Sequence, residues 1–148
     1  MKRMLLTISY DGTDYHGWQV QPNGITVQRT LQDCLEKLLN KRVSVSGCSR
    51  TDAGVHARVF TCHLDCEDNF PENAFTFGLN SLLPNDISVI DCKEVSLDFH
   101  SRYNAKGKKY VYSMYCGSQN PFDSRYKLHI SKTPDIDLMN EFCHGISS

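Results

Sequence analysis

A single carboxylate stands among cations in the stretch GCSRTDAGVHARV, residues 47–59. Asp52 is the only acid between Glu36 and Asp65. The same interval holds these basic residues: Lys37, Lys41, Arg42, Arg50 and Arg58. Nearby cations favour the ionised form of a carboxylate and attract phosphate groups. An ionised carboxylate in such a place could act as a nucleophile or an electrostatic stabiliser at a sugar carbon.

A simpler interpretation of Asp52 is structural. It lies in a predicted turn between two strands, where it could cap the turn or pair with Arg50 or Arg58. His56 could orient the same turn, although a structural hydrogen bond is the more ordinary role of a turn histidine. The residues alone leave both interpretations of Asp52 open.

A second basic region follows later in the chain. Residues 99–122 contain no acid but hold four cations: Arg102, Lys106, Lys108 and Lys109. We predict that they contact phosphate groups, which would make binding salt-dependent. A solvated strand edge guarded by lysines is the alternative. The net charge of −1 decides nothing here, because binding depends on where the charge lies.

The composition predicts one soluble globular domain. The chain has 148 residues, of which 40% are hydrophobic and 22% charged. No apolar run approaches the ~20 residues that span a bilayer, and no secretory signal precedes the first predicted strand. The seven cysteines include no CxxC pair, which predicts reduced thiols in the cytoplasm. Cys62 and His63 should face opposite sides of a strand, so we expect no metal site there.

Apolar periodicity predicts strands and helices in the order βαββαβ. Strands are expected over residues 3–10, 42–48, 58–65 and 86–95, and helices over residues 26–40 and 71–82. Thr26 should cap the first helix, Asn69 and Pro71 should begin the second, and Pro84 should end it. This α+β order is ferredoxin-like, with an antiparallel sheet and both helices on one face. RNA-recognition modules share it and receive bases on the open sheet face.

Two further elements follow the βαββαβ unit. A fifth strand is expected over residues 108–116, and a helix starts after Pro134 with Leu138, Met139 and Phe142 on one face. Since the chain ends soon after this helix start, we expect it to be a piece of a longer protein.

The segment at residues 11–24 is a long polar excursion that also carries aromatic side chains. Long loops of this kind are often functional. We predict that Trp18 and Gln19 contact RNA. The alternative is a loop pinned to the body of the domain by Trp18.

Four segments together resemble the TruA family of tRNA pseudouridine synthases. They are SRTDAGVHA (residues 49–57), YDGTDYHGWQVQP (10–22), TVQRTLQDCL (26–35) and DFHSRYNAKGKKYVY (98–112). The resemblance implies isomerisation of uridine to pseudouridine at positions 38–40 of the tRNA anticodon arm, without a cofactor. It also implies an additional central strand of the pseudouridine synthase fold.

The resemblance assigns roles residue by residue. Asp52 corresponds to the catalytic aspartate, Tyr110 to a tyrosine that stacks on the flipped uracil, and Arg50 to an arginine that holds the base out of the helix. Arg58 is a further candidate RNA contact. Without the resemblance, Tyr110 reads as a strand core residue and Arg50 as a surface arginine. A non-catalytic RNA-binding module on the same fold is the competing function.

Family members also have a second, similar half, with the active site in the cleft between the halves. The resemblance therefore divides this chain into residues 1–100, which carry the catalytic aspartate, and residues 101–148, the central strand and a truncated second half. It implies a homodimer that binds tRNA across both subunits. We expect little activity from these 148 residues alone.

Overall fold

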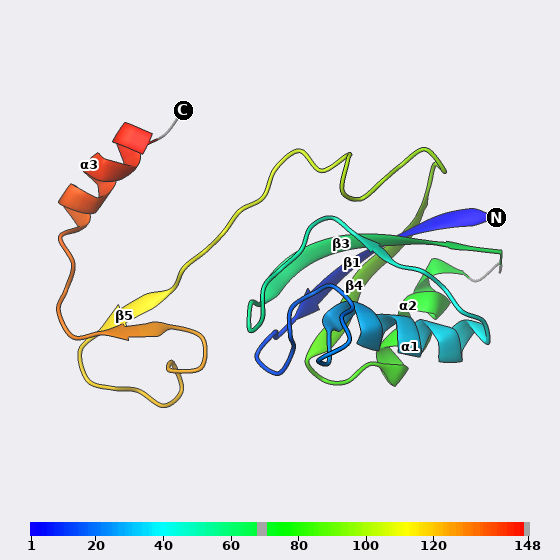
Figure 1. Cartoon of the computed structure of the whole chain (residues 1–148), viewed down its shortest axis with the longest axis horizontal. Helices are drawn as coiled ribbons and strands as arrows, with labels where there is room; N and C mark the ends of the chain where they lie inside the picture. Colours follow the sequence, from blue (N-terminus) through cyan, green and yellow to red (C-terminus); the bar gives the residue numbers. More distant parts are fainter. Residues whose placement is uncertain (68–70, 147–148) are drawn as a thin grey trace. The chain divides into compact units, whose positions relative to one another are not determined.

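The computed structural model describes residues 1–67 and 71–146 (Figure 1). The chain divides into two compact units, Met1–Lys106 and Gly107–Ser148, and each is described by itself. Asn69, predicted as a helix cap, lies outside the described residues. Within those residues, no helix combines the length and the apolar character that crossing a membrane requires.

The first unit is an antiparallel sheet with two helices on one face (Figure 1). Its elements are β1 (Lys2–Tyr10), α1 (Val27–Leu39), β2 (Ser46–Gly47), β3 (Ala57–Cys66), α2 (Glu72–Leu82) and β4 (Ile87–Val95). The strand order is β2-β3-β1-β4, so the first strand of the sequence is central. The predicted α+β fold with βαββαβ order is confirmed.

Helix α1 forms where its cap and its apolar stripe predicted it. The Thr26 hydroxyl accepts a hydrogen bond from the backbone N–H of Arg29 (3.3 Å), as an N-cap residue does. The stripe packs on the sheet through fully buried side chains: Val27, Leu31 and Leu35. Asn40 ends the helix in the left-handed conformation, at φ 52°.

Side chains of β1 alternate between two buried environments. Leu6 and Ile8 belong to the core between the sheet and the helices, together with Phe60 and Cys62 of β3. Leu5 points to the other face, where it is paired in register with His63. Both are buried as well, because a later segment covers this face.

That segment, residues 96–104, is called the strap. It runs from the end of β4 across the sheet face that the helices leave open. The Arg3 guanidinium donates to the carbonyl oxygens of Leu97 (2.6 Å) and Phe99 (2.8 Å). The same side chain binds Asp65 with two hydrogen bonds of 2.7 Å. The Ser101 backbone N–H donates to Nδ1 of His63 at 3.2 Å, and its hydroxyl lies 3.0 Å from the same atom.

Strand β2 is shorter than the prediction over residues 42–48. Both outward-facing backbone groups of Val45 bond instead to side chains of α1. Its N–H donates to Oε1 of Gln32 (3.2 Å), and its carbonyl accepts from Nε2 of Gln28 (2.7 Å). Helix side chains thus satisfy two backbone groups next to β2, the edge strand of the sheet in the described part of the chain.

The second unit contains β5 (Met114–Cys116), β6 (Leu128–Ile130) and α3 (Ile136–Ile146). The helix predicted after Pro134 is therefore present. The two strands pair in parallel. The strand predicted over residues 108–116 is shorter than expected, since within the described part of the unit only its last three residues pair in register with another strand.

Candidate functional site

Asp52 lies in a loop, residues 48–56, that joins β2 to β3; we call it the Asp52 loop. Its side chain is exposed. Among the described residues no hydrogen bond or ion pair joins the Asp52 carboxylate, so it pairs with neither Arg50 nor Arg58. The turn is closed by backbone instead, since the Val55 N–H donates to the Asp52 carbonyl oxygen at 3.2 Å. The carboxylate is therefore available to a ligand.

The backbone on both sides of Asp52 is anchored to the first strand and to the loop at residues 11–24. The carbonyl oxygen of Thr51 accepts a hydrogen bond from the backbone N–H of Trp18 (3.1 Å). The side-chain hydroxyl of Thr51 lies 2.9 Å from the Tyr10 hydroxyl. On the other side, the Gly54 N–H donates to the Tyr15 carbonyl oxygen (3.1 Å). The exposed carboxylate thus stands on a fixed backbone, which is the preorganisation that catalysis at one atom needs.

Trp18 holds the 11–24 loop against the sheet. Its side chain is only 2% exposed, and its ring lies 4.3 Å from the ring of Phe60. A β-carbon on Gly47 would come within 2.7 Å of the indole, so the ring lies flat on a residue that must lack a side chain. The alternative of a pinned loop describes Trp18 better than an RNA contact, for which it has almost no surface. Gln19, next to it, is exposed.

His56 ties the end of the Asp52 loop to the start of the 11–24 loop. Its Nδ1 accepts a hydrogen bond from the Gly12 N–H (3.1 Å) and lies 2.9 Å from Oδ1 of Asp11. The backbones also meet closely here, because a β-carbon on Gly12 would lie 2.0 Å from the Val55 carbonyl oxygen. His56 therefore makes the structural contact expected of a turn histidine, at the foot of the loop that carries Asp52.

Two buried tyrosines, Tyr10 and Tyr15, contact the Asp52 loop. Burial raises the pKa of the Tyr10 phenol to about 12, against the opposing effect of its hydrogen bond with Thr51. The Tyr15 hydroxyl donates to Oδ1 of Asp86 at 2.7 Å, and burial again raises the pKa of this phenol. Both tyrosines keep their protons near neutral pH and serve as anchors.

The other predicted contacts are exposed, but they are not all in one unit. Arg50, Arg58 and Arg102 are exposed in the first unit, and no ion pair holds them within the described residues. Tyr110 is 77% exposed and belongs to the second unit, as do the exposed Lys108 and Lys109. That Tyr110 stacks on the uracil whose sugar Asp52 attacks stays a prediction.

Cys62 and His63 face opposite sides of β3. The thiol is fully buried in the core under the helices, whereas the imidazole bonds to Ser101 of the strap. In the described part of the chain, no group of three or more His, Cys, Asp or Glu side chains is placed to hold a metal ion.

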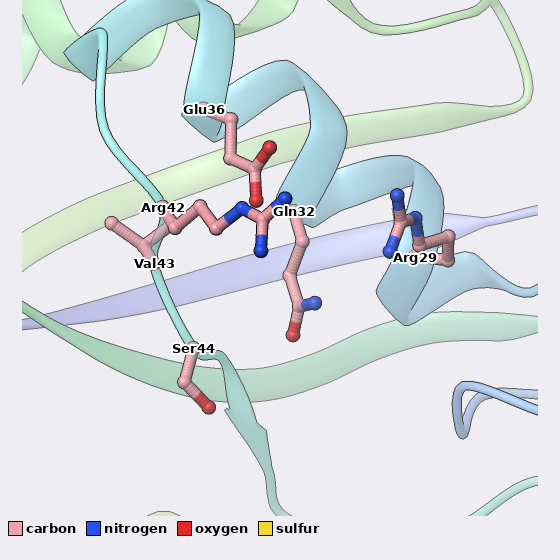
Figure 2. A pocket seen from close by; sticks show the side chains of 6 residues that line it. All are labelled: Arg29, Gln32, Glu36, Arg42, Val43 and Ser44. Atoms are coloured by element: carbon pink, nitrogen blue, oxygen red, sulfur yellow. The ribbon is translucent and has the colours of Figure 1, made fainter.

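A hollow that the sequence did not predict lies between α1 and the segment before β2 (Figure 2). The side chain of Arg42 reaches from the segment before β2 toward α1, which carries Glu36 and Gln32. The full lining is Arg29, Gln32, Glu36, Arg42, Val43 and Ser44. Arg29 is neutralised by Asp33 at 2.9 Å, and no lining residue belongs to the Asp52 loop. The hollow is therefore separate from the candidate site.

Comparison with known proteins shows which family the sequence around this site matches. The sequence pattern of the tRNA pseudouridine synthase family matches residues 6–104. The tRNA pseudouridine synthase A of Ruminiclostridium cellulolyticum is 50% identical over 115 residues, which cover 78% of this chain and 47% of that protein. The enzyme of the same name from Clostridium kluyveri is 44% identical over 144 residues, or 97% of this chain and 59% of that protein. The chain spans about half the length of these relatives.

Proposed function

The chain belongs to the tRNA pseudouridine synthase family, and on that premise we propose that the whole protein converts uridine to pseudouridine in tRNA. One observation supports this most strongly. Asp52 lies inside the segment that matches the family, and its carboxylate is exposed and without a protein partner among the described residues, on a backbone anchored from both sides. No cofactor is needed for this isomerisation.

We place the reaction at uridines 38–40 of the anticodon arm, with Asp52 as the group that acts on the sugar. The carboxylate attacks C1′ of the ribose or stabilises positive charge there while the bond from C1′ to N1 of uracil breaks. The uracil turns and rejoins C1′ through C5. The proton on C5 is lost and N1 gains one, so the reaction consumes no other reagent.

A uridine inside a stem must leave the base stack before its glycosidic bond can be reached, which costs a few kcal/mol. We propose that Tyr110 stacks on the extruded uracil and recovers about 1–3 kcal/mol of this cost. Arg50, two residues before Asp52, fills the gap in the helix or binds phosphate with its planar guanidinium. Both side chains are exposed.

The decisive experiment replaces Asp52 in the full-length protein. Asp52→Asn should abolish pseudouridine formation in the anticodon arm, measured by chemical mapping of the tRNA, while tRNA affinity stays within a few fold. Asp33→Asn is the matched control, since it removes a surface carboxylate that pairs with Arg29 on α1. Full activity of Asp52→Asn would refute the proposal.

The competing function is an RNA-binding module that uses the open sheet face. Here the strap covers that face at Arg3 and His63, which weighs against bases docking on it. Loss of chemistry without loss of binding in Asp52→Asn separates an enzyme from such a module.

We further propose that the whole protein is a cytoplasmic homodimer that binds the tRNA anticodon arm across both subunits. Because the chain spans about half of its relatives, we expect the 148-residue chain to turn over little or no tRNA. Rapid turnover by this chain alone would contradict that expectation.

A further inference from the structure

Tyr103 is an aromatic ring held in an exposed position on the strap. Its side chain is 79% exposed, yet its ring lies 4.3 Å from that of His100, tilted by 31°. The His100 ring in turn meets His63 edge-on at 4.8 Å, and His63 is buried and bonded to Ser101. Three rings therefore lead from the sheet outward, and the last presents one face to solvent.

The turn that carries this ring is closed by its own hydrogen bonds. Asn104 bonds twice to His100: its Oδ1 accepts from the His100 N–H (2.7 Å), and its N–H donates to the His100 carbonyl oxygen (2.9 Å). The Arg102 N–H donates to Nδ1 of His100 at 3.2 Å. Tyr103 and the exposed Arg102 thus lie side by side in sequence on a turn whose shape is set before any ligand binds.

We propose that Tyr103 and Arg102 form a second nucleotide-binding site, distinct from the one that takes the reacting uridine. An unpaired base of the tRNA stacks on the outer face of Tyr103, and its phosphate binds the Arg102 guanidinium. This inference rests on the proposed function only in taking tRNA as the partner.

Two observations select RNA as the occupant. After Asp98 no acid occurs up to residue 122, so the turn that carries Arg102 and Tyr103 adds no negative charge of its own to repel a phosphate. An exposed ring that is already ordered loses little entropy on stacking, and base–aromatic stacking is worth about 1–3 kcal/mol. The strap covers the sheet face on which βαββαβ modules receive bases. The exposed ring of Tyr103, on the outer surface of the strap, provides a stacking surface instead.

Binding of tRNA to the full-length protein tests the proposal in an Asp52→Asn background, so that turnover does not alter the RNA. Tyr103→Ala should weaken affinity about 5- to 150-fold. Tyr103→Phe, which keeps the ring, should stay within about twofold by the same reasoning. Phe77→Ala is the matched control, because Phe77 is an equally exposed ring (80%) on α2. It should leave affinity unchanged.

Two results would overturn the site. One is unchanged affinity in Tyr103→Ala. The other is a Tyr103→Ala protein that melts at a markedly lower temperature without RNA, which would mean that the rest of the full-length chain covers the ring. Ultraviolet crosslinking of Tyr103 to tRNA containing 5-bromouridine should be lost in Tyr103→Ala. A full-length protein that binds no tRNA at all would instead refute the proposed function.

Discussion

The backbone of Gly17 packs directly against the carbonyl group of Thr51, the residue before Asp52. A β-carbon on Gly17 would lie 2.4 Å from that oxygen and 3.2 Å from the carbonyl carbon of Asp52. Gly17 also has φ of +82°, which side chains of L-amino acids rarely adopt. The 11–24 loop can therefore pack against the Asp52 loop only because residue 17 is a glycine.

Gly17→Ala should destabilise the chain by about 1–3 kcal/mol, because it adds a steric clash to an unfavourable backbone conformation. In the full-length protein it should also lower kcat for pseudouridine formation, since it displaces the residue next to Asp52. Chemical denaturation and single-turnover assays measure the two effects. Gly107→Ala is the control, because no atom lies within 4 Å of a β-carbon there. Equal behaviour of the two variants would contradict the role of Gly17.

Trp18 and Gln19 are adjacent but should respond differently. Trp18→Ala removes a buried ring and should lower the free energy of unfolding by about 3–5 kcal/mol. Gln19→Ala should leave stability within about 0.5 kcal/mol, as surface changes do. If Gln19 contacts RNA, its variant should weaken tRNA binding by the full-length protein at unchanged stability. Unchanged affinity would count against the predicted contact.

Arg3 should control the order of the strap. Arg3→Lys keeps the charge but cannot reproduce two bonds to Asp65 and two to strap carbonyls with one ammonium group. We expect faster hydrogen exchange at the Ser101 amide, whose partner is His63. Lys2→Met serves as the control, since its ion pair with Glu94 is exposed on both sides. A strap amide that exchanges at the wild-type rate in Arg3→Lys would contradict this role.

His63 should make the chain less stable in mild acid. Burial lowers its pKa below the ordinary value of 6.5, and the neighbouring Arg3 and His100 act in the same direction, opposed by Asp65. The unfolded chain then binds a proton at His63 more readily than the folded chain does. The folded state is therefore not penalised above about pH 6.5, and the free energy of unfolding falls as the pH drops below that value. His63→Asn should flatten this part of a denaturation profile from pH 8 to pH 5. His144→Gln, exposed on α3, should not.

The apolar periodicity predicted α1, α2 and the βαββαβ order of elements along the chain, because it reports which positions of each element are buried. It overestimated β2, since the bonds of Val45 to Gln28 and Gln32 depend on side chains that no local pattern specifies. The strap escaped prediction for a similar reason. Its anchors are polar side chains of Arg3 and His63, which lie 38 to 96 residues away from their partners in the sequence.

For the candidate site, the sequence singled out Asp52 by its isolation among cations, and the structure places it in an exposed turn. Trp18 was ambiguous, because an aromatic side chain in a polar loop fits both a ligand contact and an anchor. The close contact between the Trp18 ring and Gly47 favours the role of anchor. This contact forms only when β2 and the 11–24 loop have come together.

The central place of β1 in the sheet has a consequence for biosynthesis. Both of its neighbours, β3 and β4, are made later, and Arg3 contacts a residue as distant as Phe99. The nascent chain therefore cannot complete this sheet by local pairing, and β1 stays without one of its two partners until the ribosome has synthesised β4. Messages that stop short of β4 should yield aggregating polypeptides that depend on chaperones for their solubility.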